Sequence, residues 1–386
     1  MKALCLVGAW LPLLANIALA DVERRYHYDG KGVAEEIPRN AKGEIHGTRK
    51  EYSLQGKLIH RAEYRDGAPH GVDERFTEEG KLLSRRGYRA GNLHGAFEEW
   101  AHDGKPKKKG SYVDGELDGD YIEYSREGKP KIETRYRAGR YHGKVVRYDD
   151  EGHRLEEIPH TDGVARQEGT AILYHPNGKP KERQVFRAGK ADGPREEFDE
   201  NGTRRLAERF EKGERAGASE NFDSQGRLTE RTAYAKGIRN GLHEVFAEDG
   251  KLRERAAYKG DVLEGVYETL FSDGRPSQRL MYHDGKKQGE QSDYYPDGKV
   301  RSRIPYTADR LSGEARFFFA SGRDMCQVRY ADDRRDGPMI CWYPAGGKAM
   351  EATYLSGQVQ TVRWHDRQGA VVMELESPLE WLQSIP

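Results

Sequence analysis

Four histidines occupy equivalent places in the first half of the chain, and imidazole nitrogens are common metal ligands. They are His46, His70, His94 and His142. Each lies directly before a glycine, at a spacing of 24 residues or a multiple of it. If one period is a pair of strands, equivalent residues lie about 9.5 Å apart, whereas zinc lies about 2.1 Å from its ligands. Neighbouring histidines cannot share an ion, so we expect solvated turns, as Asp118 and Gln288 at the same place in later repeats also indicate.

Adjacent carboxylates suggest a second chemistry, general acid–base catalysis. The candidates are the pairs Glu98–Glu99 and Glu196–Glu197. Consecutive side chains of a strand point to opposite faces, so neither pair forms a catalytic dyad. The short motifs of serine hydrolases, zinc proteases, P-loop proteins and dinucleotide-binding proteins are also missing from a fitting context. We expect no catalytic residue, no bound metal and no cofactor.

Two cysteines near the C-terminus suggest a disulfide. Cys326 and Cys341 remain if the apolar leader that contains Cys5 is removed, and an exported chain enters an oxidising compartment. The two residues belong to neighbouring predicted strands, opposite each other or about three residues out of register, depending on where the connecting turn lies. A disulfide and a pair of free thiols both remain open.

The elements that position these residues follow from an internal repeat. When the glycine of each His-Gly-like pair is numbered zero and called the anchor glycine, anchors recur every 24 residues from Gly47 to Gly143 and, after one step of 26, from Gly169 to Gly337. Counting a first repeat from Glu23, position +9 is glycine in all 14 repeats, +5 is aromatic in 13 and +17 in 12. The exceptions are Leu270 at +5 and Asn40 and His160 at +17. A fixed period of this kind marks a repeat array.

The glycines divide each repeat into two short runs with one fixed aromatic each, and such runs between Asp-Gly and Asn-Gly turns predict strands. We therefore predict an all-β fold: an elongated, single-layer antiparallel sheet of tandem β-hairpins with a 24-residue period. The composition agrees, because 35% hydrophobic residues do not make a thick core, whereas 22 Tyr, 11 Phe and 5 Trp argue against disorder. We expect the aromatics at +5 and +17 to stack on like residues of neighbouring strands.

The repeat pattern divides the chain into four segments. They are a signal peptide at 1–20, a repeat sub-array of six β-hairpins at 23–168, a sub-array of eight at 169–360 and a C-terminal cap at 361–386. An apolar run that ends in Ala18-Leu19-Ala20 predicts cleavage by signal peptidase. The 26-residue step, near Pro159, indicates a seam between sub-arrays or a looped-out insertion. Within the cap, residues 377–383 ("SPLEWLQ") predict a short helix.

Charge and hydropathy exclude several classes of partner. The 65 basic and 65 acidic residues cancel, which gives no long-range attraction to nucleic acid. The one basic run, Lys105 to Gly110, is diluted by nearby acids, so we expect no nucleic-acid binding. After the leader no stretch approaches the ~18 apolar residues of a membrane span. We expect an exported protein of the periplasm or the extracellular space.

These repeats resemble a known family. The stretch "GDYIEYSREGKPKIETRYRAGRYHG" (Gly119 to Gly143) is similar to the variant MORN repeat of bacterial YwqK-type antitoxin proteins, and the likeness covers residues 23 to 357. The resemblance implies an elongated, curved sheet of hairpins that acts by binding, such as neutralising a toxic partner. MORN-type arrays in general resemble protein-interaction or membrane-associated scaffolds. Antitoxins of cytoplasmic toxins need no signal peptide. The apolar leader of this chain therefore departs from them and fits an immunity role in the bacterial envelope.

We therefore expect an exported, non-catalytic binding scaffold, antitoxin-like or immunity-like, that engages a protein partner on its repeat sheet. The alternative is a protein that binds cell-wall glycan or a membrane surface, although only Trp100 and Trp342 occur in the repeat columns. The candidate binding and stacking face consists of Tyr64, Tyr88, Trp100, Tyr112, Tyr136, Tyr234, Tyr258, Tyr282, Tyr306, Tyr330 and Tyr354. Tyrosine suits such a face, because its ring is apolar and its hydroxyl bonds to water.

Overall fold

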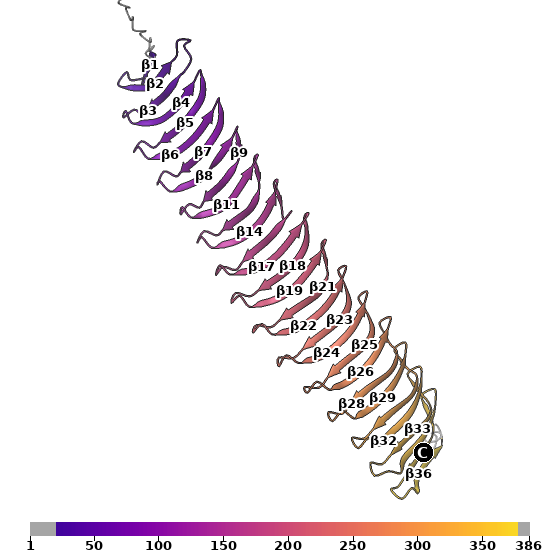
Figure 1. Cartoon of the computed structure of the whole chain (residues 1–386). Helices are drawn as coiled ribbons and strands as arrows, with labels where there is room; N and C mark the ends of the chain where they lie inside the picture. The colour runs from indigo at the N-terminus through magenta and orange to yellow at the C-terminus, as the bar shows by residue number, and fades with distance from the viewer. Residues whose placement is uncertain (1–20, 377–386) are drawn as a thin grey trace, which may run out of the picture. The chain divides into compact units, whose positions relative to one another are not determined.

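The computed structural model describes residues 21–376, and every helix or strand within this range is a β-strand (Figure 1). The strands pair as tandem antiparallel hairpins, which confirms the predicted fold class. No helix among residues 21–376 is long and apolar enough to cross a membrane. The predicted signal peptide (1–20) and the predicted helix (377–383) lie outside the described residues. The Cα positions divide the chain into two units, Met1–Gln167 and Glu168–Pro386; the predicted junction lies at 168/169.

In the N-terminal unit, each long strand pairs with the next along the chain, and the two-residue strands are the first residues of an interrupted long strand. The strands are β1 (Asp21–Tyr26), β2 (Val33–Arg39), β3 (Gly47–Tyr52), β4 (Leu58–Arg65), β5 (Ala68–Phe76), β6 (Leu82–Arg89), β7 (Asn92–Trp100), β8 (Pro106–Val113), β9 (Glu116–Leu117), β10 (Gly119–Tyr124), β11 (Pro130–Arg137), β12 (Arg140–Tyr141), β13 (Gly143–Tyr148), β14 (Arg154–Thr161) and β15 (Val164–Ala165).

The C-terminal unit follows the same rule of consecutive pairing. Its strands are β16 (Gly169–Tyr174), β17 (Pro180–Arg187), β18 (Lys190–Phe198), β19 (Arg204–Glu211), β20 (Glu214–Arg215), β21 (Gly217–Phe222), β22 (Leu228–Ala235), β23 (Ile238–Phe246), β24 (Leu252–Lys259), β25 (Val262–Leu270), β26 (Pro276–His283), β27 (Lys286–Lys287), β28 (Gly289–Tyr294), β29 (Val300–Thr307), β30 (Arg310–Leu311), β31 (Gly313–Phe318), β32 (Asp324–Ala331), β33 (Arg334–Trp342), β34 (Lys348–Leu355), β35 (Gln358–His365) and β36 (Val371–Glu376).

The hairpin turn at positions +6 to +10 explains the glycine that every repeat carries at +9. Between β7 and β8 the Gly104 amide donates to the Ala101 carbonyl at 2.9 Å, and the Ala101 amide donates to the Lys105 carbonyl at 2.8 Å. Gly104 has a φ of 89°, a left-handed conformation in which other side chains are strained. Glycine at +9 is therefore a requirement of the turn.

The lysine that follows this glycine connects successive hairpin turns. Lys129 Nζ donates to the backbone carbonyl of Glu151 at 2.7 Å, and Lys179 Nζ donates to that of Asn201 at 2.9 Å. In both cases the acceptor lies in the next hairpin turn, 22 residues further along the chain. The frequent Gly-Lys pair thus combines a backbone requirement with a contact between neighbouring hairpins.

A second, shorter turn links each hairpin to the next. Val113 and Glu116 are cross-strand partners, so only Asp114 and Gly115 make the turn between β8 and β9. Both have positive φ, 49° and 94°, as a tight two-residue hairpin requires. The connection therefore lies at +19 and +20, which sets the register of every following strand.

The pairing register assigns each position to one of two sheet faces. Phe97 pairs with Gly110 and Glu99 with Lys108, so positions +2, +4, +13, +15 and +17 share one face, here called the tyrosine face. Positions +1, +3, +5, +14 and +16 share the other, here called the ladder face, because side chains alternate along a strand.

A thin core lies along the tyrosine face at positions +2 and +15. Val145 and Ile158 are cross-strand partners with 2% and 7% of their surface exposed, and Ala315 is fully buried. Phe97, 4% exposed, packs against Gly110, where an added Cβ would come within 2.8 Å of the ring. The apolar interior is one row of side chains, which accounts for the polar composition.

The ladder face carries alternating charges instead of an apolar row. The Glu74 carboxylate lies between the guanidinium groups of Arg61 and Arg85 and is 4% exposed. Burial opposes ionisation of Glu74, but hydrogen bonds from the two arginines outweigh it and hold its pKa below the ordinary value. These pairs satisfy charges across neighbouring strands.

Both ends of the described chain differ from the predicted pattern. Tyr28, assigned to +5 of the first repeat, is 93% exposed and lies in the turn, because β1 ends two residues earlier, at Tyr26. Residues 361–376, predicted to belong to a cap, instead continue the hairpins as part of β35 and as β36. After the link, the second strand of each pair contains extra residues at a register shift. β35 has one extra residue where β33 has two, so the turn glycine moves from +9 to +8, at Gly369.

Candidate functional site, a groove on the tyrosine face

The predicted tyrosines form one column on the tyrosine face. Each lies at +17, opposite an anchor glycine, as Tyr112 lies opposite Gly95. The predicted face also includes Trp100, which lies on the opposite face, because it is three positions, an odd number, after Phe97 on β7. His160, an exception to the aromatic column, still presents a ring there, 5.4 Å from that of Tyr141.

The prediction that aromatic residues at the same repeat position stack on one another is wrong. Like positions lie two strands apart, about 9.6 Å, and the residue at −2 of the intervening strand fills the space. The rings of Tyr136 and Tyr141, at +17 and −2, are 4.9 Å apart. In four repeats of the C-terminal unit a cation takes this place. The Arg239 guanidinium, for example, lies 4.1 Å from the ring centre of Tyr258.

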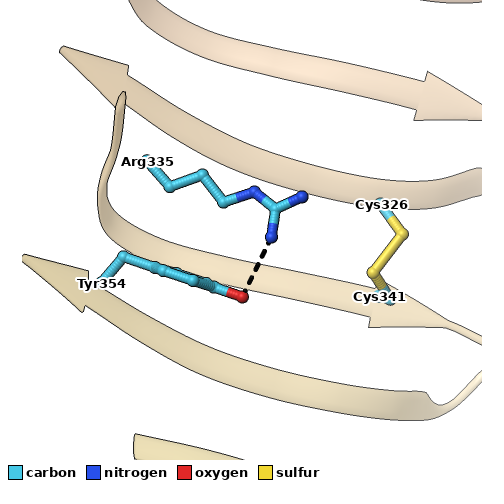
Figure 2. Close-up of a disulfide and its surroundings, with 4 residues drawn as sticks. All are labelled: Cys326, Arg335, Cys341 and Tyr354. Atoms are coloured by element: carbon cyan, nitrogen blue, oxygen red, sulfur yellow. Dashed lines mark hydrogen bonds between the residues drawn. A yellow bond between two sulfur atoms is a disulfide. The ribbon is translucent and has the colours of Figure 1, made fainter. Parts of the chain in front are cut away.

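Figure 2 shows the same arrangement in the last complete repeat. The Arg335 guanidinium lies 5.2 Å from the ring centre of Tyr354 and donates to its hydroxyl at 3.1 Å. Cys326 and Cys341 are direct cross-strand partners on β32 and β33, and the structure joins them by a disulfide of 2.13 Å. The three-residue offset does not occur, because the link turns at +19 and +20 and β33 then contains two extra residues at its register shift.

A groove of about 800 Å³ opens on the tyrosine face of the N-terminal unit, beside Tyr64 and Tyr88. Its other lining residues include Arg49, Glu51, His60, Asp73 and Arg75 from β3, β4 and β5. Two of the predicted tyrosines therefore border one hollow.

The groove exists because the core row is interrupted here. Positions +2 of these two repeats are Arg49 and Asp73, and Ala62 at +15 is their cross-strand partner. The next two repeats carry Phe97 and Tyr121 at +2, and these rings fill the corresponding space. Polar side chains and a single methyl group leave a hollow that aromatic rings occupy in the next two repeats.

A histidine ring between two carboxylates lies at one side of the groove. His60 Nε2 is 3.0 Å from Asp73 Oδ2, and His60 Nδ1 is 3.3 Å from Glu51 Oε1, with the ring mostly buried. The hydrogen bond to Asp73 raises the pKa of His60 above its ordinary value, while burial acts in the opposite direction. When the ring is protonated, both nitrogens donate and it has no free lone pair to serve as a base.

Two arginines give the groove unused hydrogen-bonding capacity. Arg49 binds Glu35 at 2.7 Å and Glu51 at 2.8 Å, and its buried Nε has no hydrogen-bond partner among residues 21–376. Arg75 is exposed, and its guanidinium makes no hydrogen bond or ion pair with any described residue. The groove therefore combines two aromatic rings with a free guanidinium, which suits a carboxylate.

The sequence singled out Tyr64 and Tyr88 but not Arg49, His60, Asp73 or Arg75. The available signal was the +2 column, which is charged in these two repeats and aromatic in the next two. It is weak, because strands also carry charged residues on solvated faces.

The histidines before the anchor glycines lie at the linking turns. His70 Nδ1 accepts the Ala90 amide at 3.3 Å, and Glu264 and Gln288 accept the equivalent amides of Asp284 and Ala308 at 2.8 and 3.0 Å. A side-chain acceptor at −1 thus caps the turn amide at +19, whichever polar residue supplies it.

Two groups of three side chains bring metal-ligand atoms close together within residues 21–376. They are Asp149, Glu151 and His153, and Glu264, His283 and Asp284. Both lie at turns, and Asp149 accepts the His153 amide at 2.8 Å while Glu264 accepts that of Asp284. These contacts are those of turn capping.

The adjacent glutamates have separate partners. Glu98 lies 3.7 Å from Arg85 on the ladder face, and Glu99 lies 2.7 Å from Arg86 on the tyrosine face. They point to opposite sides of the sheet and share no reaction centre.

The comparisons with curated proteins and with solved structures carry no argument about the fold. A search of curated proteins finds no match. Among solved structures, the crystal structure of TcdB2-TccC3 is 12% identical over 92% of this chain and 23% of that chain, at a TM-score of 0.18. The crystal structure of TcdB2-TccC3-Cdc42 is 13% identical over 92% and 22%, at 0.16. At these TM-scores neither structure informs the fold or the function, and this chain spans less than a quarter of each.

The family model described as MORN repeat variant matches residues 93–114, 167–188 and 287–308. Each match runs from two residues before an anchor glycine to position +19, so it covers one hairpin with its turn and both sheet faces. In three of its copies, therefore, the 24-residue hairpin of this chain matches the MORN repeat variant.

Proposed function

We propose that the mature chain is an exported, non-catalytic scaffold that binds a protein partner in the groove of its N-terminal unit. The observation that carries the proposal is the interruption of the core row at Arg49 and Asp73, which leaves a lined hollow between Tyr64 and Tyr88. A row filled in neighbouring repeats and open here indicates a place for another molecule.

The chemistry of the groove favours a protein segment with a carboxylate. Arg75 offers a guanidinium without a partner, and the buried Nε of Arg49 is a further unused donor. Tyr64 and Tyr88 supply apolar ring surface with a hydroxyl, a combination enriched in protein interfaces. An aspartate or glutamate side chain flanked by apolar residues would satisfy both features.

An antitoxin-like or immunity-like role in the bacterial envelope is the finer part of the proposal. Its support is the resemblance of the repeats to YwqK-type antitoxins together with the apolar leader at 1–20. Binding by an open sheet requires no catalytic group, which fits neutralisation of a toxic partner. Binding of cell-wall glycan or of a membrane surface is the alternative outcome of the experiment below.

The experiment places a photo-crosslinking amino acid in the mature chain at Arg75 and, as the matched control, at Val72. Val72 lies on the same strand, β5, and is exposed, but it belongs to the ladder face. The proposal predicts one stoichiometric protein adduct at 75, formed with envelope extract, and none at 72. Adducts at both positions, at neither, or only with peptidoglycan or lipid vesicles would refute it.

Export has its own test. The N-terminal sequence of the chain recovered from producing cells should begin at Asp21, in the periplasmic or extracellular fraction. Recovery of a cytoplasmic chain that retains Met1 would contradict the envelope role. The proposal that the groove binds a partner would still be decided by the crosslinking experiment.

A further inference from the structure

Strands β21 to β26 of the C-terminal unit carry an apolar row on the ladder face, at positions +1 and +16. The row is Ala218, Ala233, Leu242, Ala257, Val266 and Met281. Leu242 is 50% exposed and Met281 is 43% exposed, so large apolar side chains face solvent. Each hairpin contributes one pair of direct cross-strand partners, for example Leu242 with Ala257.

A row of charges lies beside it on the same face, at positions +3 and +14. It is Glu220, Arg231, Glu244, Arg255, Glu268 and Arg279, acid and base in strict alternation. Neighbours within the row form ion pairs: Arg231 lies 3.0 Å from Glu220 and 3.4 Å from Glu244. Arg255 lies 2.7 Å from Glu268.

We propose that this face packs against the same face of a second copy of the chain, about a two-fold axis that runs parallel to the strands between β23 and β24. Such an axis reverses the strand order, so that β23 lies over β24 of the second copy and β21 over β26. The axis places the charge row of one copy over the charge row of the other, and the apolar row over the apolar row.

The reversed sequence is complementary in charge at every position. Glu244 faces Arg255 of the second copy, Arg231 faces Glu268 and Glu220 faces Arg279. A row that alternates over six strands always places an acid over a base when it is reversed. Complementary potentials of this kind select a partner and an orientation.

The reversed sequence is also complementary in size. Leu242 faces Ala257 of the second copy, and Met281 faces Ala218. Val266 faces Ala233, so each large side chain meets a methyl group. Interdigitation of large with small side chains is how two sheets pack about 10 Å apart.

The available area is that of a stable dimer. Six strands about 4.8 Å apart, each with about eight residues at 3.4 Å, present a face of about 29 by 27 Å. Stable interfaces bury about 800 Å² on each partner. Aligned sheets cross at about 30°, so the central strands β22 to β25 make the closest contacts.

The corresponding strands of the N-terminal unit lack this pattern. On β3 to β8 the charge row is Lys50, Arg61, Glu74, Arg85, Glu98 and Lys109, and the row beside it is Thr48, Glu63, Val72, Gly87, Ala96 and Ser111. Reversal would place Lys50 over Lys109, and Glu63 would interrupt the apolar contact. Self-complementarity is thus a property of β21 to β26 and not of the repeat in general.

Sedimentation of the mature chain tests the proposal. The wild type should have twice the monomer mass, and Leu242→Lys should weaken the dimer about a hundredfold, because unpaired charges enter an apolar contact. The matched control is Val72→Lys, at the same repeat position and 40% exposed, which should leave the dimer intact. A wild type that stays monomeric up to about 100 µM, or a dimer unaffected by Leu242→Lys, overturns the proposal.

A second measurement does not depend on a destabilising change. Chains with Leu242→Cys are mixed with chains that carry Ala257→Cys and are oxidised, and the mixture should form a disulfide-linked heterodimer. Replacing the first partner by Val72→Cys is the control and should give none. Crosslinking that does not discriminate between 242 and 72 contradicts the two-fold arrangement.

Discussion

The ring of Phe97 lies against Gly110, its direct cross-strand partner, in the space that a Cβ at 110 would occupy. An added Cβ at Gly110 would lie 2.8 Å from Phe97 Cε1 and 3.3 Å from the Asp120 carbonyl oxygen. The two residues act as one packing unit within a core that is a single row of side chains.

Gly110→Ala should destabilise the N-terminal unit by about 1–3 kcal/mol through overpacking. Loss of backbone freedom in the unfolded chain would by itself stabilise it by about 0.4–1 kcal/mol, so the sign of the change is informative. Urea unfolding measures it. The double variant Phe97→Leu with Gly110→Ala should recover most of the loss, and a stabilised Gly110→Ala would contradict the packing.

Reduction of the Cys326–Cys341 disulfide should lower the free energy of unfolding of the C-terminal hairpins by up to about 3 kcal/mol, since the bond closes a loop of about 15 residues. Thermal unfolding followed by circular dichroism, with and without reductant, measures the change. A Cys326→Ser, Cys341→Ser chain is the control and should not respond to reductant. Two thiols that react with iodoacetamide in the native, non-reduced chain would disprove the bond.

The stability of the N-terminal unit should depend on pH through His60. Its pKa is raised by the hydrogen bond to Asp73 in the folded chain, so the stabilisation is complete below the ordinary histidine value near 6.5. It is lost as the pH rises through the raised pKa, because the imidazolium then loses its proton. Urea unfolding from pH 5 to 9 should show this decline, and His60→Gln should flatten it. Equal slopes for both chains would contradict the assignment.

Glu264→Leu should accelerate hydrogen exchange of the Asp284 amide, whose proton Glu264 accepts in the folded chain. Glu264→Gln keeps a carbonyl acceptor at the same place and should preserve most of the protection. Residue-resolved exchange by NMR distinguishes the two variants. Equal acceleration by both would show that the amide at the linking turn is not capped by the residue before the anchor glycine.

Much of the fold followed from glycine, because its role is local. Gly104 and Gly115 occupy conformations with positive φ, which few other residues adopt, so the two turns of a repeat can be placed from sequence alone. With the turns placed, strands of alternating residues and antiparallel pairing follow. Placing the turn by a fixed spacing fails at Gly369, because β35 contains one extra residue at its register shift instead of two.

Register and the groove are less accessible because they depend on non-local geometry. Cys326 lies opposite Cys341 because the link turns at +19 and +20 and the next strand then contains two extra residues, a detail no single residue encodes. The groove depends on what is missing, an aromatic ring at Arg49 and Asp73, and hollows have no sequence signature of their own.

Distances between hairpin turns test the central claim, that each 24-residue repeat adds one hairpin to an open sheet. Spin labels at Asp249 and Asp297, at +8 and two repeats apart in the C-terminal unit, should lie about 19 Å apart. Labels at Asp249 and Ser321, three repeats apart, should lie about 29 Å apart. Electron–electron dipolar measurements on the mature chain should find this linear increase. Distances that do not increase with the number of repeats would contradict the account.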